Sequence, residues 1–100
     1  MQNSALLWHD LTCCYLMQLN RVSTINKNDV AAKCYATAKH AVKLCPQSWL
    51  HWNILGVICM SVYIKNYALA QHCFIMAIDR ESNNAIAWSN LGTLYLHLGI

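Results

Sequence analysis

The chain has 100 residues, of which 57% are hydrophobic and 11% are charged, and its formal net charge is +3. Because typical globular chains carry about 25% charged residues, this chain is too apolar for a disordered protein and has little charge to cover a free-standing surface. No window of about 20 residues lacks charged or strongly polar groups, which disfavours a membrane-spanning helix. We therefore expect a soluble section of a longer stack of helices, located in the cytoplasm, with the nucleus as the alternative.

Hydrophobic periodicity predicts five helices, and no stretch shows the period of two that is typical of strands. The predicted helices cover residues 4–19, 29–45, 48–61, 67–80 and 85–98, with a polar loop at 20–28. Asn28 or Asp29 can cap the second helix and Ser48 the third, because their side chains accept hydrogen bonds from free first-turn amides. Residues 82–84 can turn and cap before the fifth. The sequence thus predicts an all-α fold of antiparallel helix pairs, with the fifth helix unpaired.

The second half of the chain repeats itself with a period of 36 residues, which indicates a stack of like units. The residues that carry this signature are Trp8, Leu11, Tyr15, Ala38, Ala41, Pro46, Trp52, Leu55, Gly56, Ala70, Phe74, Ala77, Trp88, Leu91, Gly92 and Tyr95. We interpret them as structural: tryptophan, leucine and phenylalanine fill gaps between layers, and glycine allows paired helices to approach closely. On this basis Gly92→Leu should destabilise the fold more than Gly56→Ala.

The pattern W-x-x-L-G-x-x-Y at 88–95 and A-x-x-x-F-x-x-A at 70–77 resembles the tetratricopeptide repeat. The resemblance implies a right-handed solenoid of about two and a half repeats, an α solenoid whose closing turn contains Pro46. The sequence departs from the pattern at Thr12, where glycine is expected, and at Ser82, where proline is expected. About ten residues are also added between the first two helices relative to a standard unit.

Segments 51–57, 66–75 and 87–96 are similar to part of the long repeat scaffold of the superkiller (Ski) complex. In that family the scaffold holds an RNA helicase and a β-propeller subunit, and the assembly feeds RNA to the cytoplasmic exosome. The resemblance therefore implies a scaffold for protein partners in RNA decay. A generic peptide-binding adaptor built from the same repeats is the alternative.

In the resembled family the first helix of each pair lines a groove that binds partners. The corresponding positions are His9, Cys13, Leu16, Asn53, Val57, Met60, Ser89, Thr93, Leu96 and His97. The first, third and fifth predicted helices contain no lysine or arginine, so a clamp for the carboxylates of an acidic peptide is not expected. An uncharged peptide or a helix of a larger partner fits such a surface better.

Direct contact with RNA is a second hypothesis, because Lys33, Lys39, His40 and Lys43 project from one side of the second helix. No stacking aromatic residues interleave with them, so we favour a solvated outer face and expect no nucleic-acid binding. The opposite end of the chain is apolar: Tyr95, Leu98 and Ile100 should face nothing, and the isolated chain should self-associate.

The six cysteines suggest neither disulfides nor metal, since they follow no zinc spacing and stand where helices bury small residues. Catalysis is the weakest hypothesis. His9 and Cys13 could meet one helical turn apart, but nothing nearby orients the histidine, and adjacent residues such as His72 and Cys73 point in different directions. We therefore predict no enzyme activity, no metal and no cofactor.

Overall fold

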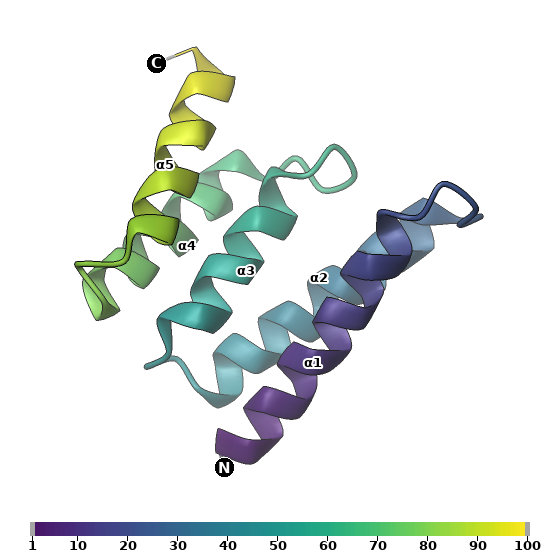
Figure 1. The fold of residues 1–100 in the computed structure, drawn as a ribbon, viewed down its shortest axis with the longest axis horizontal. Coiled ribbons are helices and arrows are strands. Elements are labelled where there is room, and N and C mark those ends of the chain that lie inside the picture. The colour runs from purple at the N-terminus through teal and green to yellow at the C-terminus, as the bar shows by residue number, and fades with distance from the viewer. Residues whose placement is uncertain (1, 100) are drawn as a thin grey trace.

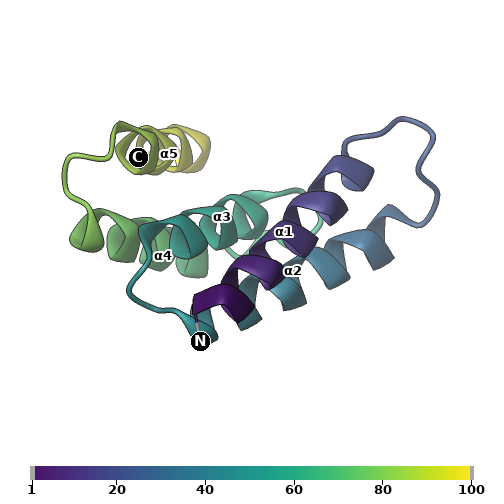
Figure 2. The same ribbon diagram turned by 60° about the horizontal axis from the view of Figure 1, so that its bottom comes forward.

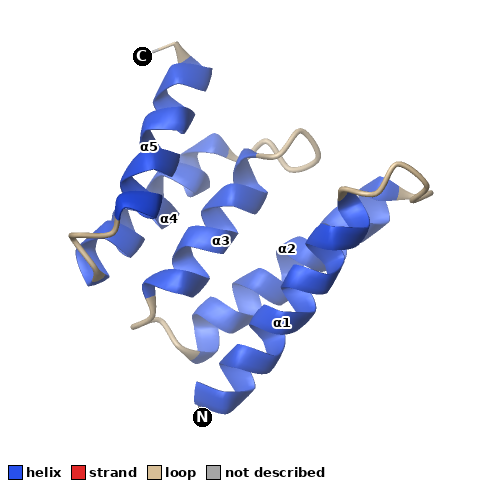
Figure 3. Ribbon diagram, in the orientation of Figure 1, coloured by secondary structure: helices blue, strands red, loops and turns tan. Residues whose placement is uncertain are grey.

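The computed structural model describes residues 2–99, which form five helices and no strand (Figures 1 and 3). The helices are α1 (Gln2–Leu19), α2 (Lys27–Leu44), α3 (Trp49–Met60), α4 (Tyr67–Arg80) and α5 (Ala85–Leu98). The predicted all-α class is confirmed. No helix within the described range is long and apolar enough to cross a membrane.

The helices form two layers, with α1, α3 and α5 in front of α2 and α4 in the view of Figure 1. α1 and α2 make one antiparallel hairpin, α3 and α4 make the next, and α5 packs on α3 and α4 (Figure 2). The molecule measures 39 × 37 × 19 Å, and its short dimension is about two helix diameters. Each hairpin packs on the next, as in a solenoid.

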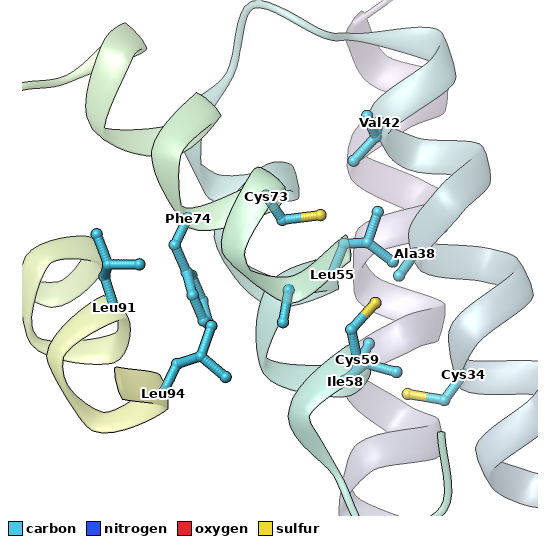
Figure 4. Close-up of a cluster of buried hydrophobic side chains, with 11 residues drawn as sticks. Cys34, Ala38, Val42, Leu55, Ile58, Cys59, Cys73, Phe74, Leu91 and Leu94 are labelled. Carbon is cyan, nitrogen blue, oxygen red and sulfur yellow. The ribbon is translucent and has the colours of Figure 1, made fainter. Parts of the chain in front are cut away.

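The core is centred on Phe74, which is fully buried and lies between α5 and the rest of the core (Figure 4). On one side it faces Leu91 and Leu94 of α5, and further cysteine and aliphatic side chains of α2, α3 and α4 complete the cluster. The small signature residues Ala38, Ala41, Ala70 and Ala77 are all fully buried, which lets the helix axes approach each other. Burial of this small-residue stripe explains why the hairpins pack closely.

The two strong repeats share a hydrogen bond between a tryptophan and the preceding turn. The indole Nε1–H of Trp52 donates to the carbonyl of Pro46 at 2.7 Å, and that of Trp88 donates to the carbonyl of Ser82 at 2.8 Å. Only a backbone acceptor is needed at the turn, so serine can replace proline there without loss of this bond. Trp88 was predicted to fill a gap between layers, but 54% of its surface is exposed in the described structure.

The two signature glycines differ in their surroundings. A Cβ added at Gly56 would lie 2.5–2.9 Å from three ring atoms of Phe74, so this glycine does allow the close approach of α3 and α4. A Cβ added at Gly92 would meet nothing within 4 Å. The predicted order of destabilisation is therefore wrong, because no helix packs against Gly92 among the described residues.

The first hairpin buries the predicted alanines of α2 but differs from the prediction in α1. Leu11 is exposed, whereas Thr12 is fully buried at the position where the repeat has glycine. The hydroxyl oxygens of Thr12 and Thr37 lie 2.8 Å apart and link α1 to α2. A buried hydroxyl needs hydrogen-bond partners, and the carbonyls of Trp8 and Cys34 are also within reach of Thr12 and Thr37, respectively, so each hydroxyl has an acceptor.

Helix capping also differs in part from the prediction. α2 begins at Lys27, after Asn26, whose left-handed backbone (φ 58°) lets its carbonyl accept from the amides of Asp29 and Val30. Neither predicted cap of α2 acts, and Ser48 precedes α3 without a side-chain cap bond. Asn84 does cap α5, because its side-chain oxygen accepts from the amides of Ile86 and Ala87.

Candidate partner-binding surface

α1, α3 and α5 present one shared surface, which we call the front face. Within the described range, α3 and α5 carry no lysine, arginine, aspartate or glutamate, and α1 carries only Asp10. A surface with so little charge has no means of pairing several carboxylates of a ligand. The chemistry available on the front face is therefore apolar contact together with hydroxyl, amide and imidazole hydrogen bonding.

The predicted groove residues fall into three groups by accessibility. Those exposed are Val57, Ser89, Thr93, Leu96 and His97; those half-buried are His9, Cys13, Leu16 and Met60; Asn53 is buried. Leu96 is the most accessible apolar side chain of the set, at 80% exposure. The exposed members lie mainly on α5, so α5 supplies most of the accessible chemistry of the front face.

Asn53 is buried and takes part in a hydrogen bond between neighbouring units, so its side-chain oxygen is not available to a ligand. The side-chain amide of Asn90 in α5 donates to the side-chain oxygen of Asn53 in α3 at 2.9 Å. This bond joins neighbouring units 37 residues apart in the sequence. Asn90 was not singled out from the sequence, because the repeat signature does not specify its position.

Two histidines join α1 to α3. The rings of His9 and His51 lie 5.4 Å apart, His51 is only 2% exposed, and the Nδ1 atoms of both have no hydrogen-bond partner in the described structure. Burial, with a smaller contribution from His9, lowers the pKa of His51. A cavity of about 290 Å³ beside His51 is also lined by Leu6, Cys45, Gln47 and Ser48. Sequence analysis missed His51, since its burial depends on tertiary contacts such as the one with His9.

His9 and Cys13 do meet, but they do not resemble a nucleophile and its base. The Cys13 sulfur lies 3.6 Å from His9 Nε2. Burial, Asp10 and Cys14 raise the pKa of Cys13, whereas an activated cysteine has a lowered pKa. Since His9 Nδ1 has no partner, nothing fixes the imidazole tautomer or orientation, as a catalytic base requires.

No disulfide joins the cysteines in the described structure, and four of them are buried: Cys34, Cys45, Cys59 and Cys73. Burial and Cys13 raise the pKa of Cys34 to about 11, and the hydrogen bond with Cys59 and burial raise the pKa of Cys73. Buried cysteine side chains of this kind pack as small apolar groups. In the described part of the chain, no three histidine, cysteine or acidic side chains come together as a metal site would require.

The predicted basic outer face lies on α2, but its members are not all free. Lys39 Nζ lies 4.2 Å from the centre of the Tyr35 ring, a cation–π contact. His40 packs edge-on against Trp8 of α1, with 4.4 Å between ring centres, so it does not project outward as predicted. A shallow cavity of about 370 Å³ is lined by Ala36, Lys39, His40 and Lys43.

The C-terminal end of α5 makes a contact that the sequence did not predict. The Tyr95 hydroxyl accepts a hydrogen bond from the Gln71 amide of α4 at 2.9 Å, so Tyr95 does have a contact within the chain. Leu98 is exposed, as expected, while Ile100 lies outside the described residues.

Comparison with known proteins identifies relatives in the same family that the sequence resembles. The chain is 39% identical to tetratricopeptide repeat protein 37 of Xenopus laevis over 103 residues, which cover 98% of the chain and 7% of that protein. It is 39% identical to superkiller complex protein 3 of Mus musculus over 94 residues, covering 89% of the chain and 6% of that protein. No model of a protein family matches. The predicted resemblance is confirmed, and the chain spans a small part of the length of these relatives.

Proposed function

We propose that the chain is a section of a protein–protein interaction scaffold that binds partner segments on its front face. The observation that carries the proposal is the nearly uncharged layer formed by α1, α3 and α5. Leu96 is the most exposed apolar side chain among the predicted groove residues of this layer. The resemblance to tetratricopeptide repeats supports it, because stacked repeats use extended surfaces of this kind to hold other proteins. The ligand class is an uncharged peptide or the apolar side of a helix.

By resemblance, the partners are an RNA helicase and a β-propeller subunit, within a superkiller-like assembly that acts in cytoplasmic RNA decay. The similarity to superkiller complex protein 3 of Mus musculus supports this narrower proposal. A generic adaptor for uncharged peptides is the alternative. It shares the front face and differs only in the proteins that the face holds.

Affinity capture from cell extract, with the intact chain as bait, tests both readings. We expect Leu96→Asp to reduce capture, because a carboxylate buried in an apolar interface without a partner is costly. Ile75→Asp is the matched control: Ile75 is an exposed apolar residue of α4, in the other layer. Circular dichroism should show the same helicity for both variants.

The identity of the captured proteins separates the alternatives. Recovery of a helicase and a β-propeller protein supports the superkiller-like scaffold, and recovery of other proteins through Leu96 supports the generic adaptor. Capture of chaperones through acidic C-terminal segments would contradict the chemistry assigned to the front face. Equal loss in the two variants would place the binding surface elsewhere.

A further inference from the structure

A cavity of about 470 Å³ opens where the C-terminal ends of α1 and α3 meet the two hairpin connections. We call it the loop-edge cavity. Its walls are formed by Leu16, Leu19, Asn20, Lys27, Val57, Ile58, Ser61, Val62 and Tyr63. Its volume lies within the range of about 300–1,000 Å³ that is common for ligand pockets, and its lining is mostly apolar with a few polar groups, as in such pockets.

The fold builds this cavity from the part of the chain that departs most from the repeat. The α1–α2 connection spans residues 20–26 and is longer than a standard repeat requires, and it brings Asn20 and Lys27 to the wall. Because both hairpins are antiparallel, this connection and the α3–α4 connection lie at the same edge of the molecule (Figure 1). The lengthened loop therefore has a structural consequence, since it forms one side of a cavity.

Exposed apolar side chains lie on the two hairpin connections at this edge and in the last turn of α1. Val22 and Ile25 in the α1–α2 connection are 98% and 80% exposed, and Met17 and Val62 are also exposed. Single exposed apolar residues are common, but several at one edge of the molecule, with Val62 in the cavity wall itself, favour an interaction site there. The buried hydroxyl of Ser61, which has no hydrogen-bond partner, adds an unused polar group to the wall.

The charged residues at this edge of the molecule indicate which charge a ligand of the cavity should carry. The edge carries Arg21, Lys27 and Lys65 against the single acidic residue Asp29, whereas Lys43 and Arg80 at the opposite edge are balanced by Asp79 and Glu81. Lys27 is the only charged residue that lines the cavity. A carboxylate at the mouth of the cavity would therefore be attracted and would meet no acidic wall.

We infer that the loop-edge cavity binds a segment of a partner protein that inserts a bulky apolar side chain and places a carboxylate beside Lys27. This site adjoins the front face at Leu16 and Val57 but differs from it in charge, because the front face has no lysine to pair with an acid. The scaffold thus offers two surfaces with different chemistry. The inference does not depend on the identity of any front-face ligand.

Selection of 12-residue peptides from a random phage library on the intact chain tests the site. The enriched peptides should combine a large apolar residue with a nearby aspartate or glutamate. For the strongest synthetic peptide, Lys27→Glu should raise the Kd about tenfold, since an attractive pair becomes repulsive. Lys43→Glu, the same change at the other end of α2, should leave the Kd unchanged. Replacing the acidic residue of the peptide by lysine should weaken binding to the parent and restore binding to Lys27→Glu.

A second variant tests the apolar part of the site. Val62→Asp, in the α3–α4 connection, should also raise the Kd about tenfold, while Leu96→Asp on α5 should not. Binding lost in Leu96→Asp alone would assign the peptides to the front face and overturn this inference while leaving the proposed function intact. Failure to enrich peptides, or enrichment of peptides without an acidic residue, would also overturn it. A dimer that is seen in sedimentation and is abolished by Val62→Asp would also overturn the inference. In that case a second copy of the chain would occupy the cavity.

Discussion

Gly56 and Gly92 are equivalent in sequence, yet they lie in opposite packing environments. The ring of Phe74 occupies the space that a side chain at Gly56 would need, and Phe74 is itself fully buried. Gly92 has open space beside its Cα. The same residue type therefore serves close packing at one position and only weakens helix propensity at the other.

Gly56→Ala and Gly92→Ala form a matched pair with opposite expected effects. Gly56→Ala should lower the free energy of unfolding by about 1–3 kcal/mol through overpacking, reduced in part by the gain of helix propensity. Gly92→Ala should raise it by up to about 1 kcal/mol, since the added methyl meets nothing. Urea unfolding followed by circular dichroism measures both. A change of the same sign in the two variants would contradict the packing assigned to Phe74.

His51 should make stability depend on pH. Its pKa in the folded chain is lowered by burial and by His9, so the unfolded chain binds more protons than the folded chain below the ordinary histidine value of 6.5. The contribution of His51 is therefore fully present above about pH 6.5 and is lost as the pH falls toward the lowered pKa. Burial thus turns this residue into a source of acid sensitivity.

The measurement is the urea midpoint as the pH is lowered from about 8 to about 5, around the ordinary histidine pKa. We expect the loss of stability to be smaller in His51→Gln than in the parent, even if the variant is less stable at neutral pH. His97→Gln is the control, because His97 is an exposed residue near the end of α5. Identical pH dependence in His51→Gln and the parent would show that the imidazole is not responsible.

At the scale of the element, α2 illustrates how a charged helix can be less available than its sequence suggests. The side chain of Lys39 contacts the Tyr35 ring, and the side chain of His40 packs against Trp8. Tyr35 and Trp8 are thereby already engaged in contacts within the chain. Electrostatic attraction from the lysines would remain, but it is weak at physiological salt without further contacts.

Single-stranded RNA should consequently bind weakly to this chain, with no saturable complex at physiological salt. Fluorescence anisotropy with a labelled oligonucleotide would measure it, and Lys33→Glu and Lys39→Glu should remove the residual binding at low salt. Saturable binding that persists at physiological salt and is lost in those variants would instead make α2 a nucleic-acid surface.

At the scale of the whole molecule, low charge and exposed apolar side chains favour self-association. Leu7, Trp88, Leu96 and Leu98 are all exposed, while only 11% of the residues are charged. Such surfaces tend to pair with each other in solution when no partner covers them. We therefore expect the isolated 100-residue chain to form dimers or larger species at micromolar concentration.

Sedimentation velocity tests this expectation with two double variants of α5. Leu96→Asp with Leu98→Asp should shift the chain toward monomer, because apolar area is removed. Ser89→Asp with Thr93→Asp adds the same charge to the same helix without removing apolar area, and it should have less effect. A stable monomer of the parent chain would show that the exposed apolar residues do not suffice for association.

The sequence by itself determined the all-α class, the buried alanine stripe and the resemblance to repeat scaffolds. These features rest on local periodicity and on motifs such as Trp88-Ser-Asn-Leu-Gly92, whose spacing is fixed by the helix. Tertiary structure decided which of these positions are covered. Within the described residues Gly92 carries the motif but a side chain there would meet nothing, and Trp88 is half exposed, whereas the buried His51 and Asn53 contact helices that are distant in sequence. Sequence periodicity gives the face on which a residue lies, but burial depends on which element packs against that face, and only the three-dimensional arrangement specifies this.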